Sequence, residues 1–186
     1  MEEYFSEFSE DSACVDLGLP LPENGIYVDV GCAWPDLRSN TAFLRKRGWH
    51  GLAIDGNPFW KHYWDETPNA KFINAIVSNE TRGSFDTSGP PDMARLTGNA
   101  PEVNCIPLEH ILVAHGIEKI DFLSLDVEGR EMEALLSMNI ARHCPEIVVS
   151  EYKTHGIGED FRVKEYLEGV GYREVHRTFA NIILVR

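Results

Sequence analysis

The chain has 186 residues, of which 43% are hydrophobic and 25% are charged, and this composition predicts one globular domain rather than two. It carries 30 acidic against 17 basic side chains, and because the resulting net charge of −13 repels phosphate backbones, nucleic acid is not expected as a partner. No apolar run is long enough to span a bilayer, and the acidic first residues lack a signal-peptide pattern. The four cysteines are scattered without a C-x-x-C pair, which fits a reducing compartment and predicts a cytoplasmic protein.

The first predicted elements follow an acidic lead-in. Residues 1–24 form this lead-in, with a short helix expected around Tyr4–Phe8, and residues 25–186 are expected to form the single domain. The apolar run Ile26–Val30 predicts a buried strand. A helix is predicted over Thr41–Arg47, because the preceding Ser39 and Asn40 offer capping side chains and a glycine follows its end.

The remaining elements alternate between strands and helices. Residues 79–101 are rich in Gly, Pro, Ser, Thr and Asn, which is typical of a long functional or disordered loop. The other predicted elements are strands over residues 51–55, 71–77, 120–125, 146–150, 171–175 and 180–185, and helices over 108–115, 130–137 and 161–169. This alternation predicts an α/β fold with a parallel sheet covered on both faces. The last two strands are too close for a crossover, so they are expected to pair antiparallel.

Acidic side chains mark the first two predicted strands. Asp29 lies in the first strand and Asp55 ends the second. Open α/β sheets bind ligands at the carboxyl ends of their strands. A carboxylate that closes the second strand commonly holds the two hydroxyl groups of a ribose. The stretch Ile26–Pro58 therefore predicts a site for an adenosine-containing cofactor.

The sequence of the loop after the first strand distinguishes between a dinucleotide and S-adenosylmethionine as the cofactor. Dinucleotides need G-x-G-x-x-G, because their pyrophosphate sits on a helix N-terminus. Gly31 is followed by Cys-Ala-Trp-Pro-Asp, with no second or third glycine, and Asp36 is unfavourable beside a pyrophosphate. S-adenosylmethionine has no phosphate and carries a positive sulfonium, so an acid-rich site suits it better. The pattern favours S-adenosylmethionine over the dinucleotides.

Three segments resemble the FkbM family of S-adenosylmethionine-dependent methyltransferases: YVDVGCAWPDLRSNTAFLRKRGWHGLAIDGNP, IDFLSLDVEGREMEALL and GYREVHRTFANIILVR. The similarity runs from about Gly25 to the C-terminus, and its most specific parts are SNT…GW.GL.ID.NP and D-V-E-G. The resemblance implies the class I methyltransferase fold, a Rossmann-like three-layer sandwich whose seven-stranded sheet has an antiparallel last strand. One departure is Pro35, preceded by Trp34, where many methyltransferases carry a further glycine.

The resemblance and the strand positions together imply a set of cofactor contacts. Asp29 and Gly31 are expected to shape the methionine end, and Asp55 to take the ribose hydroxyls. Ser39 and Asn40 either cap the first helix or reach the carboxylate of the cofactor. The residues expected at the cofactor are Asp29, Gly31, Ser39, Asn40, Asp55, Asn57, Ala75, Ile76 and Asp126.

The acids after the fourth and fifth strands are candidates for catalysis. Asp126 is expected to hold the methionine ammonium, to act on the acceptor or to bind a divalent cation. Glu128 either takes part in the function of this site or caps the next helix. An alcohol acceptor must lose its proton, and His155 or Glu151 could accept it. A hard cation held by Asp126, Glu128 and Glu151 would instead lower the pKa of the alcohol.

The predicted function is O-methylation of a hydroxyl on a small metabolite, sugar or glycolipid, as the resemblance implies. Acceptor specificity is expected in residues 79–101 and 151–160, and a partner or a homodimer is expected to help close the site. Two alternatives remain open: a nucleotide-dependent oxidoreductase and a non-catalytic cofactor-binding module of the same fold. The acids Asp55, Asp126 and Glu128 argue against a degenerate site.

Overall fold

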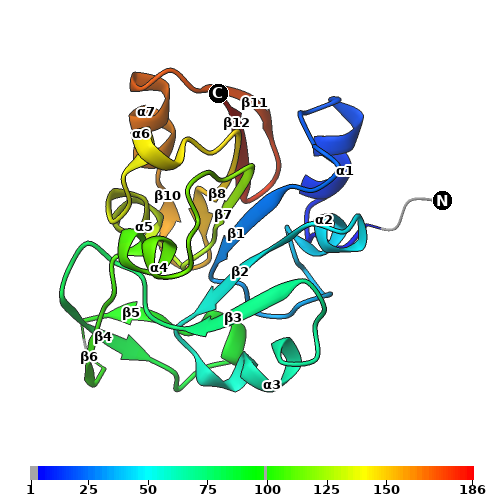
Figure 1. Ribbon diagram of the computed structural model, residues 1–186. Coiled ribbons are helices and arrows are strands. Elements are labelled where there is room, and N and C mark those ends of the chain that lie inside the picture. The colour runs from blue at the N-terminus through cyan, green and yellow to red at the C-terminus, as the bar shows by residue number, and fades with distance from the viewer. Residues whose placement is uncertain (1–3, 99) are drawn as a thin grey trace.

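The computed structural model describes residues 4–98 and 100–186, so the first three residues of the lead-in and Asn99 lie outside the described residues. Its centre is a seven-stranded sheet in the order β11–β12–β8–β7–β1–β2–β3 (Figure 1). The strands are β1 Ile26–Val30, β2 His50–Asp55, β3 Ala70–Asn74, β7 Phe122–Leu125, β8 Ile147–Glu151, β11 Arg173–Arg177 and β12 Asn181–Val185. The last strand, β12, pairs antiparallel with both neighbours, whereas the other pairings are parallel. The predicted fold class is confirmed.

Helices cover both faces of the sheet and complete three layers (Figure 1). One face carries α1 Glu10–Asp16, α2 Ala42–Lys46 and α3 Lys61–Trp64, which follows the 3-10 turn η1 Pro58–Trp60. The opposite face carries α4 Leu108–Ala114, α5 Glu131–Leu136, α6 Ile140–His143 and α7 Arg162–Gly169. Among the described residues, no helix combines the length and apolar character needed to cross a membrane.

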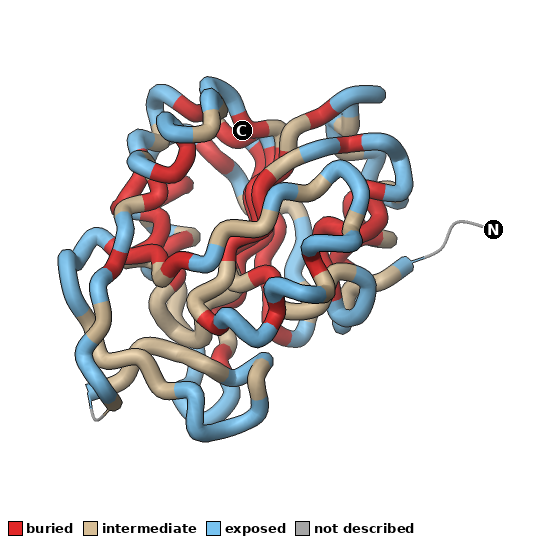
Figure 2. The backbone as a smooth tube through the Cα atoms, turned by 60° about the horizontal axis from the view of Figure 1, so that its bottom comes forward, coloured by how far each residue is buried: buried red, intermediate tan, exposed pale blue. Residues whose placement is uncertain are grey.

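Successive side chains of β1 point to opposite faces of the sheet, so this strand contributes to the core on both faces. Tyr27 packs with Phe43 and Trp49 beneath α1 and α2, whereas Val28 and Val30 pack with the helices of the opposite face. Because both faces are covered, nearly every residue of the central strands is buried, as the red core of Figure 2 shows. The carboxyl ends of β1, β2, β7 and β8 are left at one edge of the sheet.

The segment predicted as an irregular loop is instead a small antiparallel sheet. Its strands β4 Arg82–Asp86, β5 Arg95–Thr97 and β6 Glu102–Asn104 lie in the order β5–β4–β6, and the turn η2 Pro91–Met93 joins the first two. The prediction was wrong because strands of three to five residues between glycines and prolines show little alternation.

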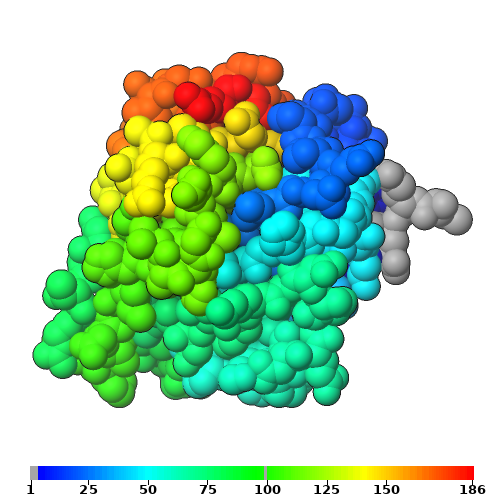
Figure 3. Space-filling model, viewed as in Figure 1, coloured from blue at the N-terminus to red at the C-terminus, as the bar shows by residue number. Residues whose placement is uncertain are grey.

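The N-terminal segment also differs from the prediction. Residues 4–8 are not helical, because the Asp11 carboxylate accepts hydrogen bonds from the backbone N–H groups of Phe5 and Ser6 and holds them as a loop. The helix begins at Glu10, whose Oε1 accepts hydrogen bonds from Thr178 Oγ1 (2.7 Å) and Asn181 Nδ2 (2.8 Å). The N-terminal segment is thereby fixed to the end of the chain, and the two surfaces adjoin in Figure 3.

Candidate active site

Three cavities lie along the carboxyl edge of the sheet, and Asp126 and Glu128 line all three. The first, of about 50 Å³, lies at the end of β2 and is called the β2 cavity. The second, of about 110 Å³, lies under the loop after β1 and is called the β1 cavity. The third, of about 680 Å³, lies beyond the end of β8 and is called the β8 cavity. Because they share these two residues, the three cavities adjoin one another along this edge.

Asp55 supplies the carboxylate of the β2 cavity. Its Oδ1 accepts a hydrogen bond from Asn57 N (2.7 Å) and its Oδ2 from Ala33 N (3.1 Å), so that the loops after β1 and β2 hold the side chain in place. Burial raises its pKa to about 6, although both backbone hydrogen bonds oppose the shift. The apolar wall beside this carboxylate comprises Ile54, Ala75, Ile76, Phe85 and Leu96.

Three further residues predicted at the cofactor have different surroundings. Ala75 and Ile76, both expected at the cofactor, line the β2 cavity. Asn57 is buried, accepts a hydrogen bond from Phe59 N and donates to Pro91 O, so it fixes the η2 turn to the end of β2. The structure thus brings Ala75 and Ile76, but not the Asn57 side chain, to the cavity surface.

The loop after β1 turns sharply at Gly31, which has a φ of 83°. The next residues fold back onto aromatic side chains: Trp34 lies 4.9 Å from Trp60 and 4.5 Å from Tyr63, measured between ring centroids. The carbonyl oxygen of Pro35 accepts a hydrogen bond from buried Arg45. The Trp-Pro pair therefore anchors the loop, while Gly31 keeps its surface open to the β1 cavity.

Polar side chains form the inner wall of the β1 cavity. Buried Asp29 accepts a hydrogen bond from Thr41 Oγ1 (2.6 Å), and its burial raises its pKa. Ser39 Oγ accepts hydrogen bonds from the backbone N–H groups of Thr41 and Ala42, so it caps α2. Asn40 Nδ2 donates to Ser124 Oγ at 3.3 Å instead of capping the helix. The cofactor roles of Asp29, Ser39 and Asn40 stay predictions.

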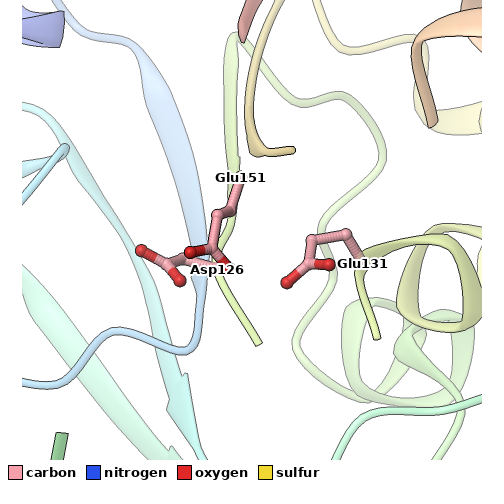
Figure 4. A group of neighbouring side chains, drawn as sticks. All are labelled: Asp126, Glu131 and Glu151. Carbon is pink, nitrogen blue, oxygen red and sulfur yellow. The ribbon is translucent and has the colours of Figure 1, made fainter. Parts of the chain in front are cut away.

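Three carboxylates converge between the β1 and β8 cavities (Figure 4). Asp126 and Glu151 come from the ends of β7 and β8, Glu131 points toward them from the start of α5, and one oxygen of each lies within 4.8 Å of the others. Glu131 Oε1 accepts hydrogen bonds from the N–H groups of Val127 and Gly129, and Glu151 Oε2 accepts one from Thr154 Oγ1 (2.7 Å). These contacts fix the side chains from outside the cluster.

The acid cluster resists full ionisation. Burial, reinforced by the charge of Glu131, raises the pKa of Glu151 to about 8, and burial raises that of Glu131 to about 7. The pKa of Asp126 lies well above its ordinary value because of burial and the charges of Glu151 and Glu131. Like charges this close disfavour each other's ionised form. Near neutral pH the cluster therefore retains protons unless a positive charge is brought to it.

Two predicted catalytic residues lie outside this cluster. Glu128 has a φ of 57° and its Oε2 lies 4.0 Å from Arg95 Nη1. Of the carboxylates expected to share a cation, Asp126 and Glu151 are brought together, and the third member of the group is Glu131 in place of Glu128. His155 is exposed in the turn between β9 Lys153–Thr154 and β10 Gly158–Glu159, at the wall of the β8 cavity. Sequence reasoning missed Glu131 because an acid in the first turn of a helix is ordinarily a cap.

Comparisons with known proteins agree with this architecture. The model of the FkbM methyltransferase domain matches residues 29–174. A solved structure from Plasmodium falciparum, provisionally described as a ribosomal RNA methyltransferase, has a TM-score of 0.55 and 15% identity over 98% of this chain and 96% of that chain, and this likeness shows the fold alone. No relative was found among the curated proteins. Because the family match spans most of the chain, including the acid cluster and all residues of the β2 cavity, the protein belongs to the FkbM family of methyltransferases.

Proposed function

We propose that the chain transfers a methyl group from S-adenosylmethionine to a hydroxyl group of a small acceptor. The observation that carries this proposal is the row of adjoining cavities from Asp55, past Gly31, to the cluster of Asp126, Glu131 and Glu151. Family membership supports the methyl transfer and the use of this donor. The choice of oxygen as the methylated atom rests on the carboxylates that could accept its proton.

The residues along the cleft fit this donor. The apolar wall of the β2 cavity suits an adenine, and Asp55 retains acceptor capacity for ribose hydroxyls. Ser39 and Asn40 offer polar atoms to an amino-acid end in the β1 cavity. The neighbouring carboxylates favour a positive sulfur, which supplies the activated methyl group. In this arrangement Asp29 and Gly31 shape the part of the pocket that receives the methionine end of the cofactor, as the sequence predicts.

Glu151 is the proposed base. It lines the β8 cavity beside Asp126, and its raised pKa of about 8 suits proton transfer near neutral pH. Positive charge beside the cluster lowers that pKa and leaves the carboxylate ionised, ready to accept the hydroxyl proton. His155 is the second candidate, but its exposed imidazole lacks the fixed position that Thr154 gives to Glu151.

A divalent cation at the cluster is the alternative way to activate a hydroxyl. Three carboxylates within reach of one another match the oxygen ligands that hard cations take. We favour the base, because Glu131 already accepts two backbone hydrogen bonds and Glu151 accepts one, and because protons alone can relieve the repulsion. The effect of chelation decides between the two arrangements.

Charge argues for a small acceptor rather than a nucleic acid. The net charge of −13 and the acid cluster both oppose a phosphate backbone. The four cysteines are unpaired, which supports a reducing compartment such as the cytoplasm. The small β4–β6 sheet and the N-terminal segment border the cavities, and closure of the site by a partner or a homodimer stays a prediction.

Thermal unfolding with ligands tests the proposal. S-adenosylhomocysteine should raise the melting temperature, whereas NAD should not. Asp55→Asn should abolish the shift, because the amide loses charge-assisted hydrogen bonds to the ribose that contribute about 1.5–3 kcal/mol each. The control is Asp65→Asn, which removes an exposed carboxylate paired with Lys61 and should leave the shift intact. Stabilisation by NAD alone would favour the oxidoreductase, and a normal donor site without turnover on broad acceptor panels would favour the non-catalytic module.

A further inference from the structure

The β1 cavity, which receives the amino-acid end of the donor in the proposed function, is strongly acidic. S-adenosylmethionine carries a carboxylate at that end beside its ammonium, and acids around a carboxylate disfavour its charged form. Among the described residues, the charged side chains that line this cavity are five acids and one base: Glu7, Asp29, Asp92, Asp126, Glu128 and Arg38. Within this lining, Arg38 is therefore the one cation that could compensate the carboxylate of the donor.

The backbone N–H groups of the turn after β1 are already used within the protein. Gly31 N donates to Ile54 O at 2.8 Å, and Cys32 N donates to the same oxygen at 3.2 Å. Ala33 N donates to Asp55 Oδ2 at 3.1 Å. Loops in nucleotide-binding sites often hold anions through such N–H groups, but these three are committed elsewhere. A carboxylate in the β1 cavity therefore depends on other donors.

The neutral side chains beside the cavity have few donors to spare. Asn40 Nδ2 gives one of its two hydrogens to Ser124 Oγ, and Ser39 Oγ accepts hydrogen bonds from the backbone at the start of α2. Each of these two side chains keeps at most one neutral donor for a ligand. Hydrogen bonds between charged groups are about twice as strong as those between neutral groups, so a carboxylate here favours a cationic partner.

Arg38 lies between the two segments that border the cavity. Its Nε lies 3.8 Å from Glu7 Oε1 in the N-terminal segment, and its Nη1 lies 3.6 Å from Asp92 Oδ2 in the η2 turn. Both separations exceed hydrogen-bonding distance, and 57% of the side chain is exposed, so neither acid saturates the guanidinium. The φ of Arg38 is 55°, a backbone conformation that is uncommon outside glycine and that recurs at functional sites.

We propose that Arg38 binds the carboxylate at the methionine end of the donor and makes the site specific for donors that retain this carboxylate. A planar guanidinium can donate two parallel N–H bonds to a carboxylate, while the acids of the same cavity suit the neighbouring ammonium. This role deepens the proposed donor site and rests on it.

Calorimetric titration with a matched pair of ligands tests this role. S-adenosylhomocysteine carries the carboxylate, and S-adenosyl-3-thiopropylamine is the same molecule without it. The natural chain should bind S-adenosylhomocysteine at least about tenfold more tightly than the amine. Arg38→Gln should weaken S-adenosylhomocysteine about tenfold and leave the amine unchanged or tighter, because only the first ligand loses a charged partner. Arg38→Lys should recover part of the loss, since it restores the charge but not the two parallel hydrogen bonds.

Variants of the ion-pair partners distinguish ligand binding from a structural tie. Glu7→Gln and Asp92→Asn each break one of the ion pairs of Arg38 but keep its guanidinium, so S-adenosylhomocysteine should bind equally or more tightly. Arg82→Gln is the matched control, because Arg82 is an exposed arginine that pairs with Glu102 outside the three cavities, and it should bind both ligands as the natural chain does.

Two results would show that Arg38 only ties the two segments together, and either would overturn the proposal. One is equal weakening of both ligands by Arg38→Gln, and the other is a loss in Glu7→Gln and Asp92→Asn as large as that in Arg38→Gln. Tight binding of S-adenosylhomocysteine that does not depend on Arg38 would also overturn it but would retain the donor site. Absence of binding by both ligands would reject the donor site and, with it, this role of Arg38.

Discussion

A Cβ atom at Gly31 would lie 1.6 Å from the carbonyl oxygen of Asp126. The loop after β1 thus packs directly on the backbone at the end of β7, and Asp126 N in turn donates a hydrogen bond to Val30 O at 2.9 Å. The same glycine that opens the β1 cavity also sets the position of an acid of the cluster. The β1 cavity and the acid cluster are therefore coupled through the backbone.

Replacing this glycine should destabilise the fold severely. Gly31→Ala combines a left-handed φ of 83° with a backbone collision, so a loss of about 3 kcal/mol or more is expected in urea denaturation. Gly48→Ala is the matched control, because Gly48 has a φ of 86° but nothing within 4 Å of a Cβ, and it should lose only about 1 kcal/mol. Equal losses would show that Gly31 does not support Asp126 by close packing.

The acid cluster should give the stability a defined pH dependence. Folding raises the pKa of Glu151 from its usual 4.5 to about 8, so the folded state binds the proton more tightly than the unfolded chain. The contribution of Glu151 to the free energy of unfolding is full below about pH 4.5 and falls as pH rises toward 8.

Glu151→Gln keeps the shape of the protonated acid and removes this dependence. The free energy of unfolding of the variant minus that of the natural chain should therefore rise by at least about 1 kcal/mol between about pH 5 and about pH 8. Urea denaturation at both pH values measures the difference, and Glu159→Gln, at an exposed surface carboxylate, is the control. A difference that does not change with pH would contradict the buried, protonated state of Glu151.

Chelation should leave the donor complex intact. With Glu151 as the base, treatment with EDTA followed by magnesium should change the melting temperature of the S-adenosylhomocysteine complex by less than about 2 °C, which corresponds to less than 1 kcal/mol for a chain of this size. Stabilisation by magnesium that disappears in Glu131→Gln would assign the cluster to a cation instead.

Donor binding should alter the small β4–β6 sheet. The β2 cavity holds about 50 Å³, well below the roughly 300 Å³ of small ligand pockets, because Phe85 and Leu96 narrow it. These side chains must shift to admit an adenine and then pack against it. Hydrogen exchange with S-adenosylhomocysteine should therefore slow at amides of β4 and β5 and stay unchanged in β11. Slower exchange in β11 alone would place the ligand elsewhere.

The sheet was predictable because its strands carry a strong local signal. Four of the five residues of Ile26–Val30 are buried and the run is apolar except at Asp29, so its composition identifies the strand, and Asp55 ends the next strand. The parallel sheet followed from the alternation of elements, and the antiparallel last strand followed from the short connection before it and from the resemblance. The carboxyl-edge position of Asp55 follows from the same topology.

The acceptor side could not be predicted because tertiary contacts build it. Glu10 and Asn181 are separated by most of the chain, and nothing local to either signals their hydrogen bond. Glu131 has the sequence position of an ordinary capping acid in the first turn of a helix, and it does accept backbone hydrogen bonds there. Its proximity to Glu151 arises only because the end of β8 packs beside the start of α5 in the folded chain. Short strands between turn residues concealed the β4–β6 sheet in the same way.

A crystal structure of the S-adenosylhomocysteine complex tests the central claim most directly. The ribose hydroxyls should contact the Asp55 carboxylate, the adenine should lie between Ile76 and Phe85, and the sulfur should face the β8 cavity near Asp126 and Glu151. A ligand whose ribose does not reach Asp55, or whose sulfur faces away from that cavity, would contradict the account.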